Sequence, residues 1–189
     1  MGDYIDEIDD LLRKKRYVEA LKMAQERVRD NPEDKFAQNT LGVVYGLIGK
    51  TKEAIEVLEK AVKNDPEFDS GLFNLAMAYM INNDTDKAIE MYKRVLPFKP
   101  NSITVLTNLG ALLMEKGLHD EGLGYLKQVI EVEPDRTEHW QNLAVAYNDI
   151  GDFDKAIEAI NKALELEPED EGAKMFKIYI MRQKEKKGE

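Results

Sequence analysis

Residues 137–170 read TEHWQNLAVAYNDIGDFDKAIEAINKALELEPED, and the spacing of this 34-residue stretch recurs along the chain. Leu143 and Tyr147 lie four residues apart, so a helix would place them on one face. Ala156 and Ala163 belong to a second apolar stripe, and Pro168 follows where a helix cannot continue. The stretch therefore predicts two helices joined by a turn.

Four ladders of residues share the spacing of 34 residues. The first consists of the prolines Pro32, Pro66, Pro100, Pro134 and Pro168. The second holds the small residues Ala20, Ala54, Ala88, Gly122 and Ala156. The other two ladders lie on the first of the two helices in each repeat. The third ladder holds Leu41, Leu75, Leu109 and Leu143. The fourth holds Leu11, Tyr45, Tyr79, Leu113 and Tyr147. Because such helix pairs cannot bury their apolar faces alone, they are expected to stack into one continuous core.

The pattern predicts an all-α fold in which five helix–turn–helix repeats are followed by a closing helix. We expect a small residue such as Gly42 to let the second helix of its pair approach closely at Ala54. Gly49 should end a first helix in a left-handed conformation, and Pro97 should shorten a second helix. The helices are predicted at about residues 3–14, 17–30, 35–48, 51–64, 69–82, 85–96, 103–116, 119–132, 137–150, 153–166 and 171–186, with a tail at 187–189. We expect the chain to fray over residues 184–189.

Composition narrows the classes of partner. The 189 residues carry a net charge of −10, which argues against binding to nucleic acid or to anionic membrane surfaces. No apolar stretch is long enough to insert into a bilayer. The chain contains no cysteine, which favours a cytoplasmic protein and leaves an exported or cropped domain as the alternative.

One pattern resembles the tetratricopeptide repeat family, and it comprises Trp140, Leu143, Ala144, Tyr147, Gly151, Asp152, Phe153, Ala156, Ala163 and Pro168. The resemblance divides the chain into repeats at 35–68, 69–102, 103–136 and 137–170, with a divergent repeat at 1–34 and a capping helix at 171–186. It implies a right-handed α-solenoid superhelix whose first helices line a concave groove, and a role in protein–protein interaction. The capping helix should cover the fifth repeat with Phe176, Ile178, Tyr179 and Met181.

In this family, the position before each buried leucine faces the groove, and here it holds Thr40, Asn74, Asn108 and Asn142. A carboxamide can donate to and accept from the backbone of a bound peptide at the same time. The column is similar to the asparagine ladder of the O-linked N-acetylglucosamine transferase superhelix. The alternative is that each asparagine bonds to a neighbouring helix of its own chain.

Apolar residues surround that column. We expect Val43, Phe73, Met77, Ala111 and Val145 to contact a peptide in the groove, either extended or helical. Burial of these residues between helices is an equally compatible interpretation.

Other functional classes lack the residues that they require. In this family, capture of a chaperone's C-terminal carboxylate needs lysine and arginine side chains at fixed positions of three consecutive first helices. None of the matching positions in this chain holds a lysine or an arginine. Counted from the second repeat they are Asn39, Val43, Asn74, Thr104 and Asn108, and counted from the third repeat they are Phe73, Met77, Asn108, Glu138 and Asn142. With two histidines and no cysteine, we expect no metal, no cofactor and no catalytic site, and His119 should serve packing. The predicted function is an adaptor that binds another protein or peptide. A self-assembling scaffold and the repeat domain of a larger enzyme or secretion machine remain alternatives.

Overall fold

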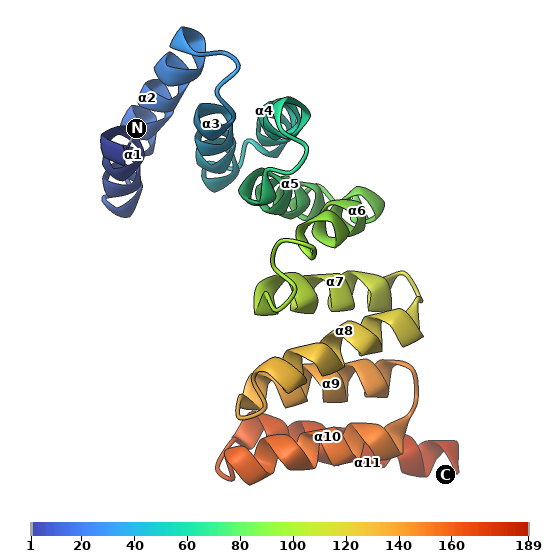
Figure 1. Ribbon diagram of the computed structural model, residues 1–189. Coiled ribbons are helices and arrows are strands. Elements are labelled where there is room, and N and C mark those ends of the chain that lie inside the picture. Colours follow the sequence, from blue (N-terminus) through green and yellow to red (C-terminus); the bar gives the residue numbers. More distant parts are fainter. Residues whose placement is uncertain (1, 189) are drawn as a thin grey trace. The chain divides into compact units, whose positions relative to one another are not determined.

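A computed structural model describes residues 2–188, which fold into eleven α-helices without a β-strand (Figure 1). The all-α class predicted from the sequence is thereby confirmed. None of these helices combines the length and the hydropathy needed to span a bilayer.

The helices alternate between two series, and the starting residues recur every 34 positions from residue 35 onward in the first series and from residue 17 onward in the second. The first helices of the pairs are α1 (Gly2–Arg13), α3 (Lys35–Leu47), α5 (Asp69–Ile81), α7 (Ile103–Glu115) and α9 (Thr137–Asp149). The second helices are α2 (Tyr17–Asp30), α4 (Thr51–Asn64), α6 (Thr85–Val95), α8 (His119–Val132) and α10 (Phe153–Leu166). The closing helix α11 (Glu171–Lys187) begins 34 residues after α9, so it has the register of a further first helix.

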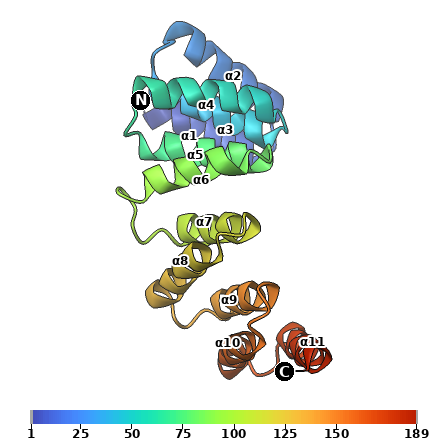
Figure 2. The same ribbon diagram turned by 90° about the vertical axis from the view of Figure 1, so that its right-hand side faces the viewer.

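The chain divides into two compact units, an N-terminal unit (Met1–Pro100) and a C-terminal unit (Asn101–Glu189). In the N-terminal unit, α3 packs against α4, and α4 packs in turn against α5 (Figures 1 and 2). In the C-terminal unit, α9 packs against α10, and α10 also contacts α11. Each unit has its own apolar core, built from buried residues of the ladders.

The turns inside the pairs require a left-handed residue. Gly49 has a φ of 77°, as the sequence predicts. In the first pair the equivalent residue is Lys15 with a φ of 58°, and in the third it is Asn83 with a φ of 61°. Asparagine tolerates this conformation better than lysine does, so the first turn carries more backbone strain.

Proline ends α6 early, also as predicted. This helix has 11 residues and ends at Val95, two residues before Pro97, whereas α4 and α8 each have 14 residues.

Glycines bring the two helices of the fourth pair into close contact. A Cβ atom at Gly110 would lie 2.9 Å from Cγ of Leu126, and one at Gly122 would lie 2.9 Å from the backbone oxygen of Gly110. The second pair differs from the expectation in detail. Gly42 is crowded by Leu58, whose Cγ would lie 2.5 Å from an added Cβ, rather than by Ala54.

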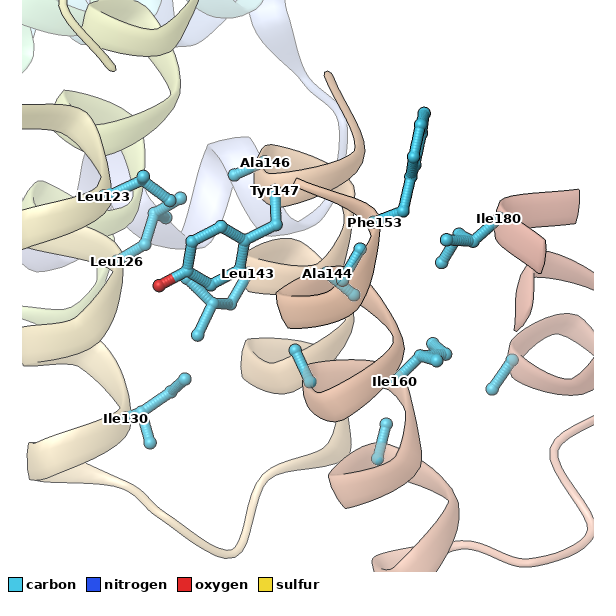
Figure 3. Close-up of a cluster of buried hydrophobic side chains, with 14 residues drawn as sticks. Leu123, Leu126, Ile130, Leu143, Ala144, Ala146, Tyr147, Phe153, Ile160 and Ile180 are labelled. Carbon is cyan, nitrogen blue, oxygen red and sulfur yellow. The ribbon is translucent and has the colours of Figure 1, made fainter. Parts of the chain in front are cut away.

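The closing helix covers α10 with a different face from the one expected. Phe176 packs against the core, but the fully covered side chains are Ala173 and Ile180, and Ile180 faces Ile160 of α10 (Figure 3). Ile178, Tyr179 and Met181, which were expected to cover the fifth repeat, are exposed.

The end of the chain also departs from the prediction. The segment expected to fray continues α11 as far as Lys187, and Gly188 caps it with a φ of 75°. The last residue of the expected tail, 189, lies outside the described residues.

Polar contacts fix the start of α11. The Asp170 carboxylate accepts a hydrogen bond from the backbone N–H of Ala173 at 3.0 Å and another from the Gln141 side chain. These donors hold the pKa of Asp170 below its usual range, because they favour the charged form. The junction between α9 and α11 therefore rests on a side-chain contact as well as on the core.

Glycine substitutions in α8 test the close approach of the fourth pair. Gly122→Ala should lower the free energy of unfolding by about 1–3 kcal/mol, because the added methyl group would meet backbone atoms. The matched control, Gly124→Ala on the same helix, has open space at the Cβ and should raise stability by about 0.5–1 kcal/mol. Urea denaturation measures both changes, and equal effects would contradict the described packing.

Candidate functional site

The predicted column lies on the first helices, one position before buried leucines. Thr40, Asn74, Asn108 and Asn142 are each half-buried, whereas the leucines that follow them are almost completely covered. Thr40 and Asn74 belong to the N-terminal unit, and Asn108 and Asn142 belong to the C-terminal unit. Each unit therefore holds its own part of the column.

In the N-terminal unit, two column residues already have partners within the chain. The Nδ2 of Asn74 donates to Oδ1 of Asn39 on the preceding first helix at 2.9 Å, which matches the alternative interpretation of the asparagines. The hydroxyl of Thr40 donates to the backbone oxygen of Phe36 at 2.9 Å. Neither contact uses every polar atom of the side chain, but both hold it in place.

Phe73 and Met77 of the N-terminal unit pack in the core with part of their side chains and expose the rest. Both are half-buried and pack against Tyr92 of α6. The Phe73 and Tyr92 rings meet edge to face with centroids 6.1 Å apart, and the Tyr92 hydroxyl donates to Sδ of Met77 at 2.9 Å. Val43 is also half-buried. The most exposed apolar side chains here are Leu47 and Ile81, at 59% and 57% exposure.

The C-terminal unit contains a cavity between its first helices. Its volume is about 430 Å³, within the range of sites that bind small molecules or side chains. It brings together three residues that the sequence predicts for the groove, Ala111, Asn142 and Val145. The residues that complete the lining are Thr107, Met114, Glu115, His119, Leu126, Ala146 and Asp149.

The lining separates into an apolar part and polar groups. Met114, Leu126 and Ala146 are apolar, and Val145 is 44% exposed. The Asn142 carboxamide makes no hydrogen bond to any residue between 2 and 188, so its donors and its acceptor can serve a ligand.

Two carboxylates give the cavity a negative charge. Glu115 and Asp149 are the last residues of α7 and α9, where backbone carbonyls already produce a negative potential. Neither helix has a basic residue in its last turn. Within the described part of the chain, no lysine or arginine forms an ion pair with either carboxylate. The acidic side chains are therefore placed where they repel the helix dipole and attract a cation.

The sequence does not predict several of these lining residues for the groove. Glu115 and Asp149 lie 34 residues apart, and this spacing could have identified them as one acidic position shared by two repeats. The expectation that His119 serves packing is wrong, because its side chain is exposed and lines the cavity.

A second cavity of about 450 Å³ lies beside α10 and differs in charge. Two of its lysines, Lys155 and Lys162, form ion pairs with Asp152 and Glu165 at 2.6 Å. Both lysines of this cavity are thus paired within the chain, unlike Glu115 and Asp149.

Comparison with protein families identifies the repeats. Three family models, each described as tetratricopeptide repeat, match residues 5–67, 49–112 and 138–170. The chain belongs to the tetratricopeptide repeat family. No curated protein gives a significant match to the sequence.

Solved structures of tetratricopeptide repeat proteins share the fold. A MamA protein is 25% identical with a TM-score of 0.80, and the match covers 89% of this chain and 94% of that one. MamA from Desulfovibrio magneticus RS-1 is 19% identical with a TM-score of 0.81, covering 90% and 96%. YrrB, described as a TPR protein with an unusual peptide-binding site, is 23% identical with a TM-score of 0.80, covering 92% and 90%.

A double-mutant cycle tests whether Asn39 and Asn74 couple adjacent repeats. Asn39→Ala and Asn74→Ala should each destabilise the protein, and the double variant should lose less than the sum. The expected coupling is about 0.5–1.5 kcal/mol, the net contribution of one hydrogen bond. A coupling energy near zero in urea denaturation would contradict the described contact.

Proposed function

We propose that the protein is an interaction module whose C-terminal unit binds a segment of another polypeptide between α7 and α9. The observation that carries this proposal is the cavity, in which an unpaired carboxamide, an apolar lining and two uncompensated carboxylates converge. Membership of the tetratricopeptide repeat family supports a protein or peptide partner. The description of YrrB as a protein with a peptide-binding site supports a peptide ligand in particular.

The lining suggests how a peptide would be recognised. Asn142 can bind a peptide N–H and C=O together, which holds the backbone without selecting a sequence. An apolar side chain of the peptide would enter the cavity against Met114 and Val145. A lysine or arginine next to it would then lie near Glu115 and Asp149, where the bond to each carboxylate is strengthened by charge.

A peptide panel tests this proposal. Extended decapeptides would carry one leucine and, one to three residues away, a lysine, a glutamine or a glutamate. The best lysine peptide should bind at least about tenfold more tightly than its glutamate counterpart, because a charge-assisted bond contributes roughly 1.5–3 kcal/mol. Fluorescence anisotropy of labelled peptides gives the dissociation constants.

Matched variants locate the interaction. The double variant Glu115→Gln/Asp149→Asn should bind the lysine peptide about tenfold more weakly than the wild type does, and its affinity for the glutamine peptide should be unchanged. The control, Glu131→Gln with Glu158→Gln, removes the same charge from exposed positions on α8 and α10 and should change neither. Asn142→Ala should weaken all peptides alike. Binding that is equal across the panel, or absent from it, would refute the proposal.

A further inference from the structure

The closing helix α11 has one face that no other helix covers within the described residues. It contacts α10 through Ala173, Phe176 and Ile180. On other sides of the helix, Met175 is 70% exposed, Ile178 is 51% exposed and Met181 is 45% exposed. Several large apolar side chains exposed on one helix form an unusual surface.

The repeat register explains what this surface corresponds to. Ile178 and Met181 lie 34 residues after Ala144 and Tyr147 of α9. These two residues of α9 are 0% and 7% exposed, and both belong to the core cluster shared by α9 and α10. The same two positions are also buried in α5, where they hold Ala76 and Tyr79, and in α7, where they hold Gly110 and Leu113.

A second helix normally covers these positions. The pairs α3–α4, α5–α6, α7–α8 and α9–α10 are each in direct contact. Ile178 and Met181 therefore occupy the place where first helices of this chain pack against a second helix. The shape required to cover them is that of an α-helix, whose axis would lie roughly 8–10 Å from that of α11.

The charge around this face differs from that of the whole chain. The chain has a net charge of −10, yet α11 contains six basic and two acidic residues. Lys174 pairs with Glu169 and Glu171, and Lys184 pairs with Asp154. Within residues 2–188, Lys177 and Arg182 form no ion pair.

These two unpaired cations border the apolar pair. Lys177 directly precedes Ile178, and Arg182 directly follows Met181. At about 100° of rotation per residue, they stand on opposite sides of the stripe that Ile178 and Met181 form. Charges that border an apolar helix seam select a partner helix of opposite charge.

We propose that this face of α11 binds an amphipathic helix of a partner protein, whose apolar stripe is bordered by aspartate or glutamate. A second copy of α11 is a poor occupant, because its own lysines and arginines would meet those of the first copy. An anionic membrane is disfavoured as well, because the rest of the chain is strongly acidic. The site is separate from the cavity between α7 and α9, so it does not depend on the function proposed for that cavity.

Helical peptides derived from α10 provide the probe, since α10 covers the equivalent positions of α9. One peptide would contain residues 153–166 with Lys155→Glu and Lys162→Glu, and its basic counterpart would contain Asp154→Lys, Glu158→Lys and Glu165→Lys. A lactam bridge on the outer face would keep these 14-residue peptides helical, because isolated helices of this length are marginal. Fluorescence anisotropy with the full chain carrying Glu115→Gln and Asp149→Asn, which removes the attraction of the α7–α9 cavity for lysine, should show the acidic peptide binding at least about tenfold more tightly than the basic one.

Variants of the full chain separate this site from other causes. Ile178→Glu should weaken the acidic peptide at least about tenfold, whereas the control Val18→Glu, at a residue that is 82% exposed, should have no effect. Lys177→Glu with Arg182→Glu should reverse the preference in favour of the basic peptide. The Asn142→Ala variant should bind the acidic peptide with the affinity of the wild type, because Asn142 lies in the separate cavity between α7 and α9. Because all of these side chains are at least partly exposed, circular dichroism should show unchanged folding.

Three results would overturn the proposal. The first is equal binding, or no binding, of the acidic and basic peptides. The second is self-association in sedimentation equilibrium that Ile178→Glu abolishes, which would assign the face to a second copy. The third is binding to phosphatidylserine vesicles that Ile178→Glu abolishes, which would assign it to a membrane.

Discussion

The structure depends on the close approach of two helices at positions where a side chain larger than methyl has no room. In the fourth pair, glycines on both helices bring the backbones so near that an added Cβ would lie 2.9 Å from a backbone oxygen. Larger residues on either side, such as Leu109 and Leu126, then fill the remaining core. Because the second helix covers one face of the first helix at each repeat, another face of the first helix is left for other contacts.

In the C-terminal unit, none of the helices α7, α8, α9 and α10 has a basic residue in its last turn. A favourable charge of this kind is found in α4 of the N-terminal unit, whose last turn contains Lys63. The first helices α7 and α9 instead end in Glu115 and Asp149, which the helix dipole disfavours. Such an arrangement reduces the stability of the free protein and favours a cationic ligand. The same reasoning applies to α11, where the exposed parts of Ile178 and Met181 do not contribute to the core of the isolated chain.

The periodic sequence predicts most of the fold and part of the site. Prolines and the glycine at residue 49 fix where helices end, and the 34-residue ladders place each helix within a few residues of its observed bounds. Burial of individual groove residues was less predictable, because Phe73 and Met77 depend on the neighbouring Tyr92. The covered face of α11 could not be predicted either, since the repeat pattern assumes a second helix that the described residues do not contain. The 34-residue spacing of Glu115 and Asp149 marks a shared acidic position, but their convergence on one cavity follows from the packing of α7 and α9.

Amide hydrogen exchange with the best lysine peptide bound tests the central claim most directly, because it reports which helices a ligand protects. If a polypeptide binds between the first helices, protection should increase in α7 and α9 and remain unchanged on the outer surfaces of α8 and α10. Protection confined to α8 and α10, or an unchanged pattern at saturating peptide, would contradict the account.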